Sequence, residues 1–137
     1  MKHRLPSVAS LAALILCCGQ SGPLHAQTAD IKTIVSVGGP PVVLNQNSQT
    51  NMAGVFMVGG TTSATVVQTG TNNATGILQF GGANSAAVGQ NGISNFTFVG
   101  QSGQSASSTL SQLGSMNTGV IAQFGGTNSS TIVQTGP

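Results

Sequence analysis

Residues 63–84 read SATVVQTGTNNATGILQFGGAN, and residues 85–106 repeat the same pattern as SAAVGQNGISNFTFVGQSGQSA. The frame runs without insertion to the end of the sequence, so each position recurs once in every unit. It gives four full units and a half unit: 41–62, 63–84, 85–106, 107–128 and 129–137. A fixed period of this length is typical of proteins in which each repeat is one coil stacked on the next.

Each unit contains two short segments that are separated by turn residues. In the second unit, Ala64–Gln68 and Asn73–Gln79 are rich in Val, Ile and Thr and are bounded by Gly and Asn. This composition favours strands over helix. The turns carry glycine at repeated positions: Gly59, Gly81, Gly103, Gly125, Gly70, Gly92 and Gly114. The sequence therefore predicts an all-β fold, a β-solenoid of 22-residue strand–turn–strand rungs that form two facing parallel sheets.

Alternation along each strand predicts which side chains point inward. One position in each strand is always aliphatic: Leu44, Val66, Val88, Leu110 and Ile132 in the first strand, and Val55, Ile77, Val99 and Ile121 in the second. Amides recur with the same parity: Gln46, Gln68, Gln90, Gln112, Gln134, Asn51, Asn73, Asn95, Asn117, Gln79, Gln101 and Gln123, with Met57 in the first unit. Because a buried amide needs a partner, we expect each column to form an inward Asn/Gln ladder between coils.

Charge and proline, which blunt the edges of most soluble sheets, are absent from the repeats. Residues 33–137 contain no Asp, Glu, Lys, Arg or His, and residues 42–136 contain no Pro. We therefore expect the end coils to present unpaired backbone groups to a second copy of the chain. Such a head-to-tail contact does not close and produces a filament. Low charge and β-rich segments are also typical of amyloid.

The missing side chains also argue against several classes of function. General acid–base catalysis, nucleophilic triads and metal sites require carboxylates, imidazoles or thiols. Nucleic-acid binding requires clustered Lys or Arg to neutralise phosphates. We therefore expect a protein that is not an enzyme, uses no cofactor or metal, and binds no nucleic acid.

The chain before the repeats divides into two predicted parts. Residues 1–26 combine a basic start with a short apolar run from Val8 to Cys18, as secretory signal peptides do. Residues 27–40 contain Asp30 and Lys32 and end in a Gly and Pro cluster. We expect them to form a flexible leader.

The outward positions of the second strand are apolar: Phe56, Val58, Leu78, Phe80, Phe96, Phe98, Val120 and Phe124. An exposed strip of this kind is a candidate for lateral bundling or matrix adhesion. The alternatives are that the parity is locally wrong, or that neighbouring sheets cover the strip. An outward column in the first strand, Thr65, Ala87, Thr109 and Thr131, leaves open a monomeric ice- or carbohydrate-binding β-solenoid.

The spacing resembles the curlin repeat of bacterial curli, whose form is Ser-x5-Gln-x-Gly-x2-Asn-x-Ala-x3-Gln. Residues 68–79, 90–101 and 112–123 fit its Gln, Gly, Asn and Gln, whereas its Ala appears only as Ala53. The resemblance implies an extracellular, cell-surface amyloid fibre of a biofilm matrix, secreted through the periplasm and outer membrane. It also implies an outer-membrane export pore and a nucleator subunit as partners. The basic terminal repeat of the minor nucleator is missing, which favours a main subunit, with the minor nucleator as the alternative.

Overall fold

A computed structural model describes residues 31–38, 42–47 and 49–137. The regular secondary structure of these residues consists of six strands: β1 Ile31–Val37, β2 Val42–Asn47, β3 Met52–Thr71, β4 Ala74–Ile93, β5 Phe96–Ser115 and β6 Thr118–Thr135. Within these ranges there is consequently no helix that could cross a membrane. The expected signal peptide, residues 1–26, lies outside the described residues.

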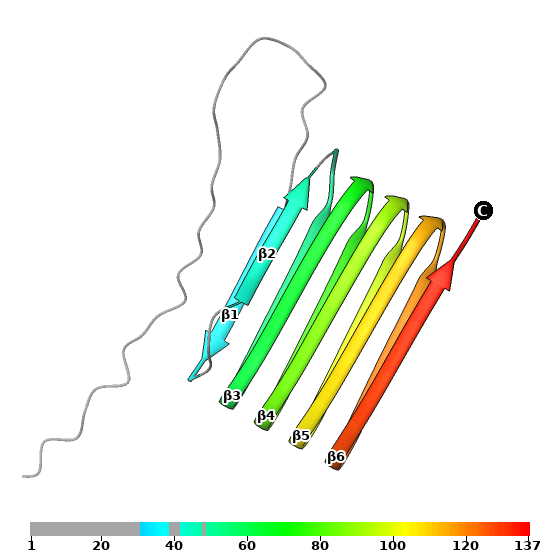
Figure 1. Cartoon of the computed structure of the whole chain (residues 1–137). Helices are drawn as coiled ribbons and strands as arrows, with labels where there is room; N and C mark the ends of the chain where they lie inside the picture. The colour runs from blue at the N-terminus through cyan, green and yellow to red at the C-terminus, as the bar shows by residue number, and fades with distance from the viewer. Residues whose placement is uncertain (1–30, 39–41, 48) are drawn as a thin grey trace, which may run out of the picture.

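The strands β3 to β6 each form one complete coil, because each turns back on itself near its middle (Figure 1). Met52 of β3 pairs with Ala74 of β4, and Ala64 pairs with Ala86, so both halves are parallel to the next coil and shifted by one whole repeat. We call β1 and the first halves sheet A: 31–37, 52–58, 74–80, 96–102 and 118–124. Sheet B contains β2 and the second halves: 42–47, 64–69, 86–91, 108–113 and 130–135. The predicted all-β solenoid with parallel stacked coils is confirmed.

The first coil consists of β1 and β2, and its corner is one residue shorter than the others. Ile31 pairs with Met52, whereas Val42 pairs with Ala64, so the step from β1 falls one position short of a whole repeat. The sequence predicts a leader over residues 27–40, outside the repeats. For residues 31–37 this prediction is wrong, because they form the strand β1. The shorter corner moves this strand one residue out of the 22-residue period, so the repeat pattern does not reveal it. The remainder of that leader, apart from Gly38, lies outside the described residues.

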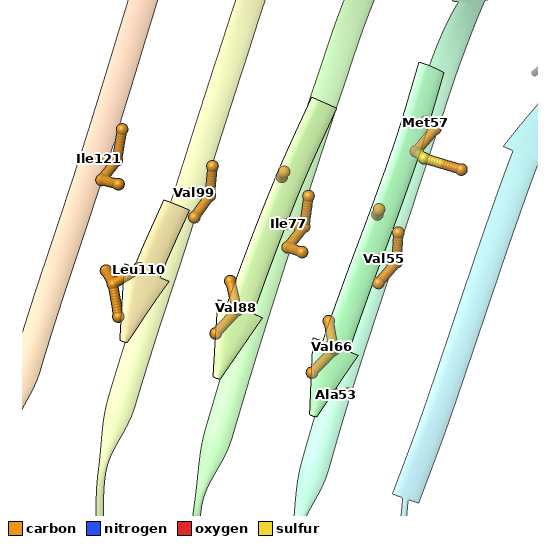
Figure 2. Close-up of a cluster of buried hydrophobic side chains, with 11 residues drawn as sticks. Ala53, Val55, Met57, Val66, Ile77, Val88, Val99, Leu110 and Ile121 are labelled. Carbon is orange, nitrogen blue, oxygen red and sulfur yellow. The ribbon is translucent and has the colours of Figure 1, made fainter. Parts of the chain in front are cut away.

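One row of aliphatic side chains fills the space between the two sheets along the stack (Figure 2). The row contains Val55, Ile77, Val99 and Ile121 from sheet A and Val66, Val88 and Leu110 from sheet B, each at most 3% exposed. Leu44 and Ile132 pack against the two ends of the row and are partly buried. Burying a side chain of this size contributes about 1.5–3 kcal/mol. No single coil has enough of them to fold alone, so each coil depends on its neighbours.

Glycine is required where the coils turn. At Gly81 the backbone has φ of 118°, and a Cβ atom would collide with the carbonyl oxygen of Gly103 in the next coil. Gly70 is placed in the same way against Gly92. The other predicted turn glycines occupy the equivalent corners: Gly59, Gly92, Gly103, Gly114 and Gly125. The glycine columns therefore allow neighbouring backbones to approach closely at both edges of the coil.

Residues other than glycine take the left-handed conformation at the turn between successive coils. They are Thr50, Asn72, Ser94 and Met116, with φ of 64°, 57°, 60° and 58°. Asn tolerates this conformation well, whereas a β-branched residue is strained in it. The turn of the first coil therefore contains the least suitable of the four residues.

Candidate functional site

The glutamines of sheet B form a ladder through all the coils. In each coil Nε2 donates a hydrogen bond to Oε1 of the glutamine in the next coil. The distances are 2.8, 2.6, 2.8 and 2.7 Å along the column Gln46, Gln68, Gln90, Gln112 and Gln134. The three central members are at most 1% exposed, and the end members are half-buried. The glutamines of successive coils thus satisfy one another's hydrogen-bonding groups, which removes the usual free-energy cost of burying an amide.

The same glutamines also connect the two sheets. Gln90 Nε2 lies 3.2 Å from the carbonyl oxygen of Ala74 and 3.1 Å from Thr97 Oγ1, both in sheet A. Thr97 Oγ1 donates in turn to Gln112 Oε1 at 2.9 Å. Thr75 makes the equivalent contacts one coil earlier. Nothing in the sequence singles out these two threonines, so their role in bridging the two sheets is not predicted from it.

The glutamine ladder of sheet A is shorter. Gln79 donates to Gln101 at 2.7 Å, and Gln101 donates to Gln123 at 2.9 Å. Met57 and Ser36 occupy the corresponding positions in β3 and β1. Gln79 Oε1 is buried and has no hydrogen-bond partner among the residues that the structure describes. The ladder of sheet A therefore begins with an unsatisfied acceptor.

The asparagine column fixes the turn between coils. The backbone N–H of each asparagine donates to Oδ1 of the asparagine one coil earlier. The distances are 3.1, 3.2 and 3.0 Å along Asn51, Asn73, Asn95 and Asn117. Asn73 Nδ2 also donates to the carbonyl oxygen of Thr69 at 2.9 Å. At the turn, where the backbone leaves the sheet, the asparagine amides therefore take the place of the backbone hydrogen bonds between strands.

A second asparagine position, which is not among the predicted site residues, fixes the opposite corner. Asn84 and Asn128 donate from Nδ2 to the carbonyl oxygen four residues earlier, at 2.8 and 3.1 Å. Asn84 follows Asn73 by half a repeat, and the same shift relates the two glutamine columns. This half-repeat period is the signal that would have found them. Thr62 and Ala106 occupy the remaining places of the column and obscure it.

The two ends of the stack carry complementary groups. Gln46 Oε1 is buried, and no group in the described part of the chain donates to it. At the other end, Gln134 Nε2 donates to the carbonyl oxygen of Thr118 at 2.8 Å. Within residues 49–137 no later coil supplies the Oε1 acceptor that the other ladder glutamines have. Continuing the ladder with a second copy would bring the Gln134 donor to the Gln46 acceptor.

The chemistry of these columns is hydrogen bonding between neutral groups. Lys32 is the sole charged side chain in residues 31–137. It pairs with Ala53 and therefore lies at an inward position of the first coil. No group of three or more His, Cys, Asp or Glu residues occurs within the described ranges. The arrangement can thus bind another strand or another coil through amides, hydroxyls and backbone groups.

Residues 70–103 match the family model of the curlin associated repeat. No curated protein and no solved structure gives a significant match to the chain. The matched segment extends from β3 into β5, and the 22-residue register continues on both sides of it. The spacing that resembles curlin in the sequence is therefore the spacing that aligns the amide ladders in the structure. Residues 70–103 are therefore similar to the curlin associated repeat, and the coils on either side share their register.

Proposed function

We propose that the protein is a secreted structural subunit that assembles end to end into extracellular, curli-like amyloid fibres. In this role it serves adhesion and aggregation in a biofilm matrix and catalyses no reaction. Its principal partner is a second copy of the same chain. The match of residues 70–103 to the curlin associated repeat supports this proposal, because self-assembly into fibres is what that family implies.

The complementarity of the two ends carries the proposal. The buried acceptor of Gln46 and the donor of Gln134 lie in one column with the same coil-to-coil step. A buried acceptor without a donor costs about 1–3 kcal/mol, and stacking a second copy would remove that cost. The edge strands also present backbone groups that a further coil can pair. Addition to an existing end is therefore more favourable than folding of a free coil.

The remaining partners follow from the same proposal. A subunit of a surface fibre has to pass the outer membrane, for which we propose a dedicated export pore. We further propose that a separate nucleator subunit starts assembly, because forming the first stacked coils is the costly step. Residues 107–137 contain no Lys or Arg, so the basic terminal repeat of the nucleator is missing, which favours the main subunit for this chain.

Seeded assembly tests the proposal. The full chain is dissolved in denaturant, diluted to micromolar concentration and followed by thioflavin T fluorescence, with and without preformed fibres. We expect a lag phase that seeds abolish. A matched control inserts one glycine between Val88 and Gly89, which turns the inward side chains that follow outward and should prevent seeding. A wild-type chain that stays monomeric for days in both conditions would contradict the proposal.

The monomeric ice- or carbohydrate-binding solenoid receives less support. That function needs a regular row of hydroxyls on one outer face. In sheet B the column of Thr65, Thr109 and Thr131 is interrupted by Ala87, and Thr65 is half-buried. We therefore retain fibre assembly as the function that the geometry supports best.

A further inference from the structure

The outer face of sheet A is apolar and exposed. All five phenylalanines of the chain occupy outward positions on it: Phe56, Phe80, Phe96, Phe98 and Phe124. Phe80, Phe96 and Phe124 are 43%, 46% and 75% exposed, and Phe56 and Phe98 are half-buried. The parity predicted for this strip is thus the parity in the structure. Within the described residues, no second sheet covers the strip.

A shallow groove of about 240 Å³ follows the stack on this face. Gly54 and Gly76 form its floor, Phe56 and Leu78 form one side, and Phe98 closes one end. A Cβ atom at Gly54 would meet no other atom within 4 Å, so the space above it is open. The groove can therefore accept a side chain from outside the molecule.

Large and small side chains are arranged in pairs across the midline of sheet A. The midline is the inward aliphatic position of each coil. The residues one step to either side are Gly54 and Phe56, Gly76 and Leu78, Phe98 and Gly100, and Val120 and Ala122. The residues three steps away are Ala74 and Phe80, Phe96 and Ser102, and Thr118 and Phe124. Each of these pairs joins a large residue to a small one, whereas Met52 and Val58 in β3, and Ile31 and Val37 in β1, are both large.

We infer that sheet A docks face to face on sheet A of a second copy of this chain, about a twofold axis parallel to the stack. This rotation keeps the coils level and reverses the strand direction. Each outward residue then faces the residue at the mirrored position across the midline of the other copy. Phe56 enters the open space above Gly54 of the second copy, whereas the space above Gly76 is already narrowed by the Phe98 ring of the same chain. The result is a dry, interdigitated interface between sheets, as in a steric zipper.

The opposite arrangement, in which the two stacks run in opposite directions, fits less well. When the two copies are centred on β4, it would place Leu78 against Leu78 and Gly76 against Gly76. Along β4, large residues would then meet large ones at Leu78 and Phe80, while Gly54 of β3 would face Phe98 of β5. The parallel arrangement avoids these contacts between large residues along β4, β5 and β6.

The size and charge of the face suit a second copy. Seven residues of strand and five coils span about 23 by 24 Å at ~3.3 Å per residue and ~4.8 Å per coil. Two such faces bury about 1,100 Å², which reaches the ~1,000 Å² expected of a specific interface. No outward position of sheet A carries a charge, so no ion has to be desolvated. Where subunits stack as proposed above, the interface also grows with each added subunit, and this step alone rests on the proposed function.

Swapping one pair across the midline tests the inference. In the full chain, Gly54→Phe would place a ring opposite Phe56 of the second copy and prevent docking. The double variant G54F with Phe56→Gly would restore a large residue opposite a small one. The matched control is Gly89→Phe, on the outer face of sheet B, where a Cβ atom also meets no atom within 4 Å. Filament width is measured by electron microscopy, and elongation rate by thioflavin T.

We expect paired filaments from the wild type, the control and the double variant. G54F should give filaments that are twofold narrower and elongate at the wild-type rate. Paired filaments in G54F, single filaments in the wild type, or a double variant that stays single would each overturn the inference while leaving end-to-end assembly intact. If no filaments form, sedimentation of the soluble chain decides the question. A wild-type dimer that becomes a monomer in G54F supports the inference, and a wild-type monomer overturns it.

Discussion

Met57 lies in register with Gln79 and interrupts the column of inward amides in sheet A. Both side chains are fully buried. A thioether sulfur has no hydrogen to donate, and the Gln79 Oε1 atom has no hydrogen-bond partner in the ranges that the structure describes. One coil later, Gln101 Oε1 receives its hydrogen bond from Gln79 at 2.7 Å. The β3 coil thus leaves a buried acceptor unsatisfied, and the coils after it do not.

Replacing Met57 with Gln should stabilise the protein. The new Nε2 atom would donate to Gln79 Oε1 in the same way that Gln79 donates to Gln101. Satisfying a buried acceptor is expected to raise the free energy of unfolding by about 1–3 kcal/mol. Guanidinium denaturation of the soluble chain measures this change. Met57→Leu, which preserves volume but supplies no donor, should give no such increase, and an equal increase in both variants would contradict the explanation.

Thr50→Asn should also stabilise the protein, through the backbone. Thr50 has φ of 64°, in the left-handed region, and Asn72 occupies the equivalent turn with φ of 57°. Relieving a β-branched residue of this conformation is expected to add about 1 kcal/mol to the free energy of unfolding. The reciprocal change, Asn72→Thr, should lower it by a similar amount. Denaturation midpoints that move in the same direction in both variants would be inconsistent with backbone strain.

Gln90→Glu should make assembly depend on pH. Residues 31–137 of the wild type contain no Asp, Glu or His, so its stack should assemble at similar rates in mild acid and at neutral pH. Burial would raise the pKa of the new carboxyl above the ~4.3 of an exposed Glu. Because the folded-state pKa is the higher one, stability is present below about pH 4 and is lost as the pH rises through the folded-state value.

We therefore expect Gln90→Glu to assemble almost normally near pH 3 and at least tenfold more slowly near pH 7, when followed by seeded thioflavin T kinetics. Asn91→Glu places the same carboxyl at an exposed neighbouring position and serves as the control. If both variants responded equally to pH, net charge rather than burial in the ladder would be responsible.

Removing either end amide should slow elongation. Gln46→Ala and Gln134→Ala each delete one member of the pair that we expect at the junction between subunits. The loss of one such bond, about 1 kcal/mol, corresponds to roughly a fivefold change. Ser85→Ala, at an exposed position, should elongate normally. The double variant should be little slower than either single variant if the two amides bond to each other, and additive effects would show that they do not.

The period and the parity of the strands determine most of the fold. Once Gln68 and Gln90 are known to be one repeat apart and to share the parity of Val66 and Val88, the inward position of the amides follows. An exact step also requires parallel stacking, because the same residues must meet in every coil. For this reason the columns predicted from the sequence are the columns found between the sheets.

The features that the sequence does not reveal are those at which the period or the residue type changes. The strand β1 escapes detection because its coil is one residue short and because Lys32 and Ser36 stand where the β4 and β5 coils have Thr and Gln. The corner position of Asn84 is hidden because Thr62 and Ala106 fill the same place. The left-handed turn residues are all of different types, so backbone conformation alone makes them equivalent.

All carboxamides in the glutamine columns point the same way along the stack. Every N–H is directed toward the later coil and every carbonyl oxygen toward the earlier one, from Gln46 to Gln134. Their bond dipoles therefore add, as peptide dipoles do along a helix, and neighbouring members polarise one another. The partial positive pole lies at the coil of β6 and the partial negative pole at the coil of β2. A ladder with two different ends can be extended only by a copy in the same orientation, so a stack built through it is polar along its whole length.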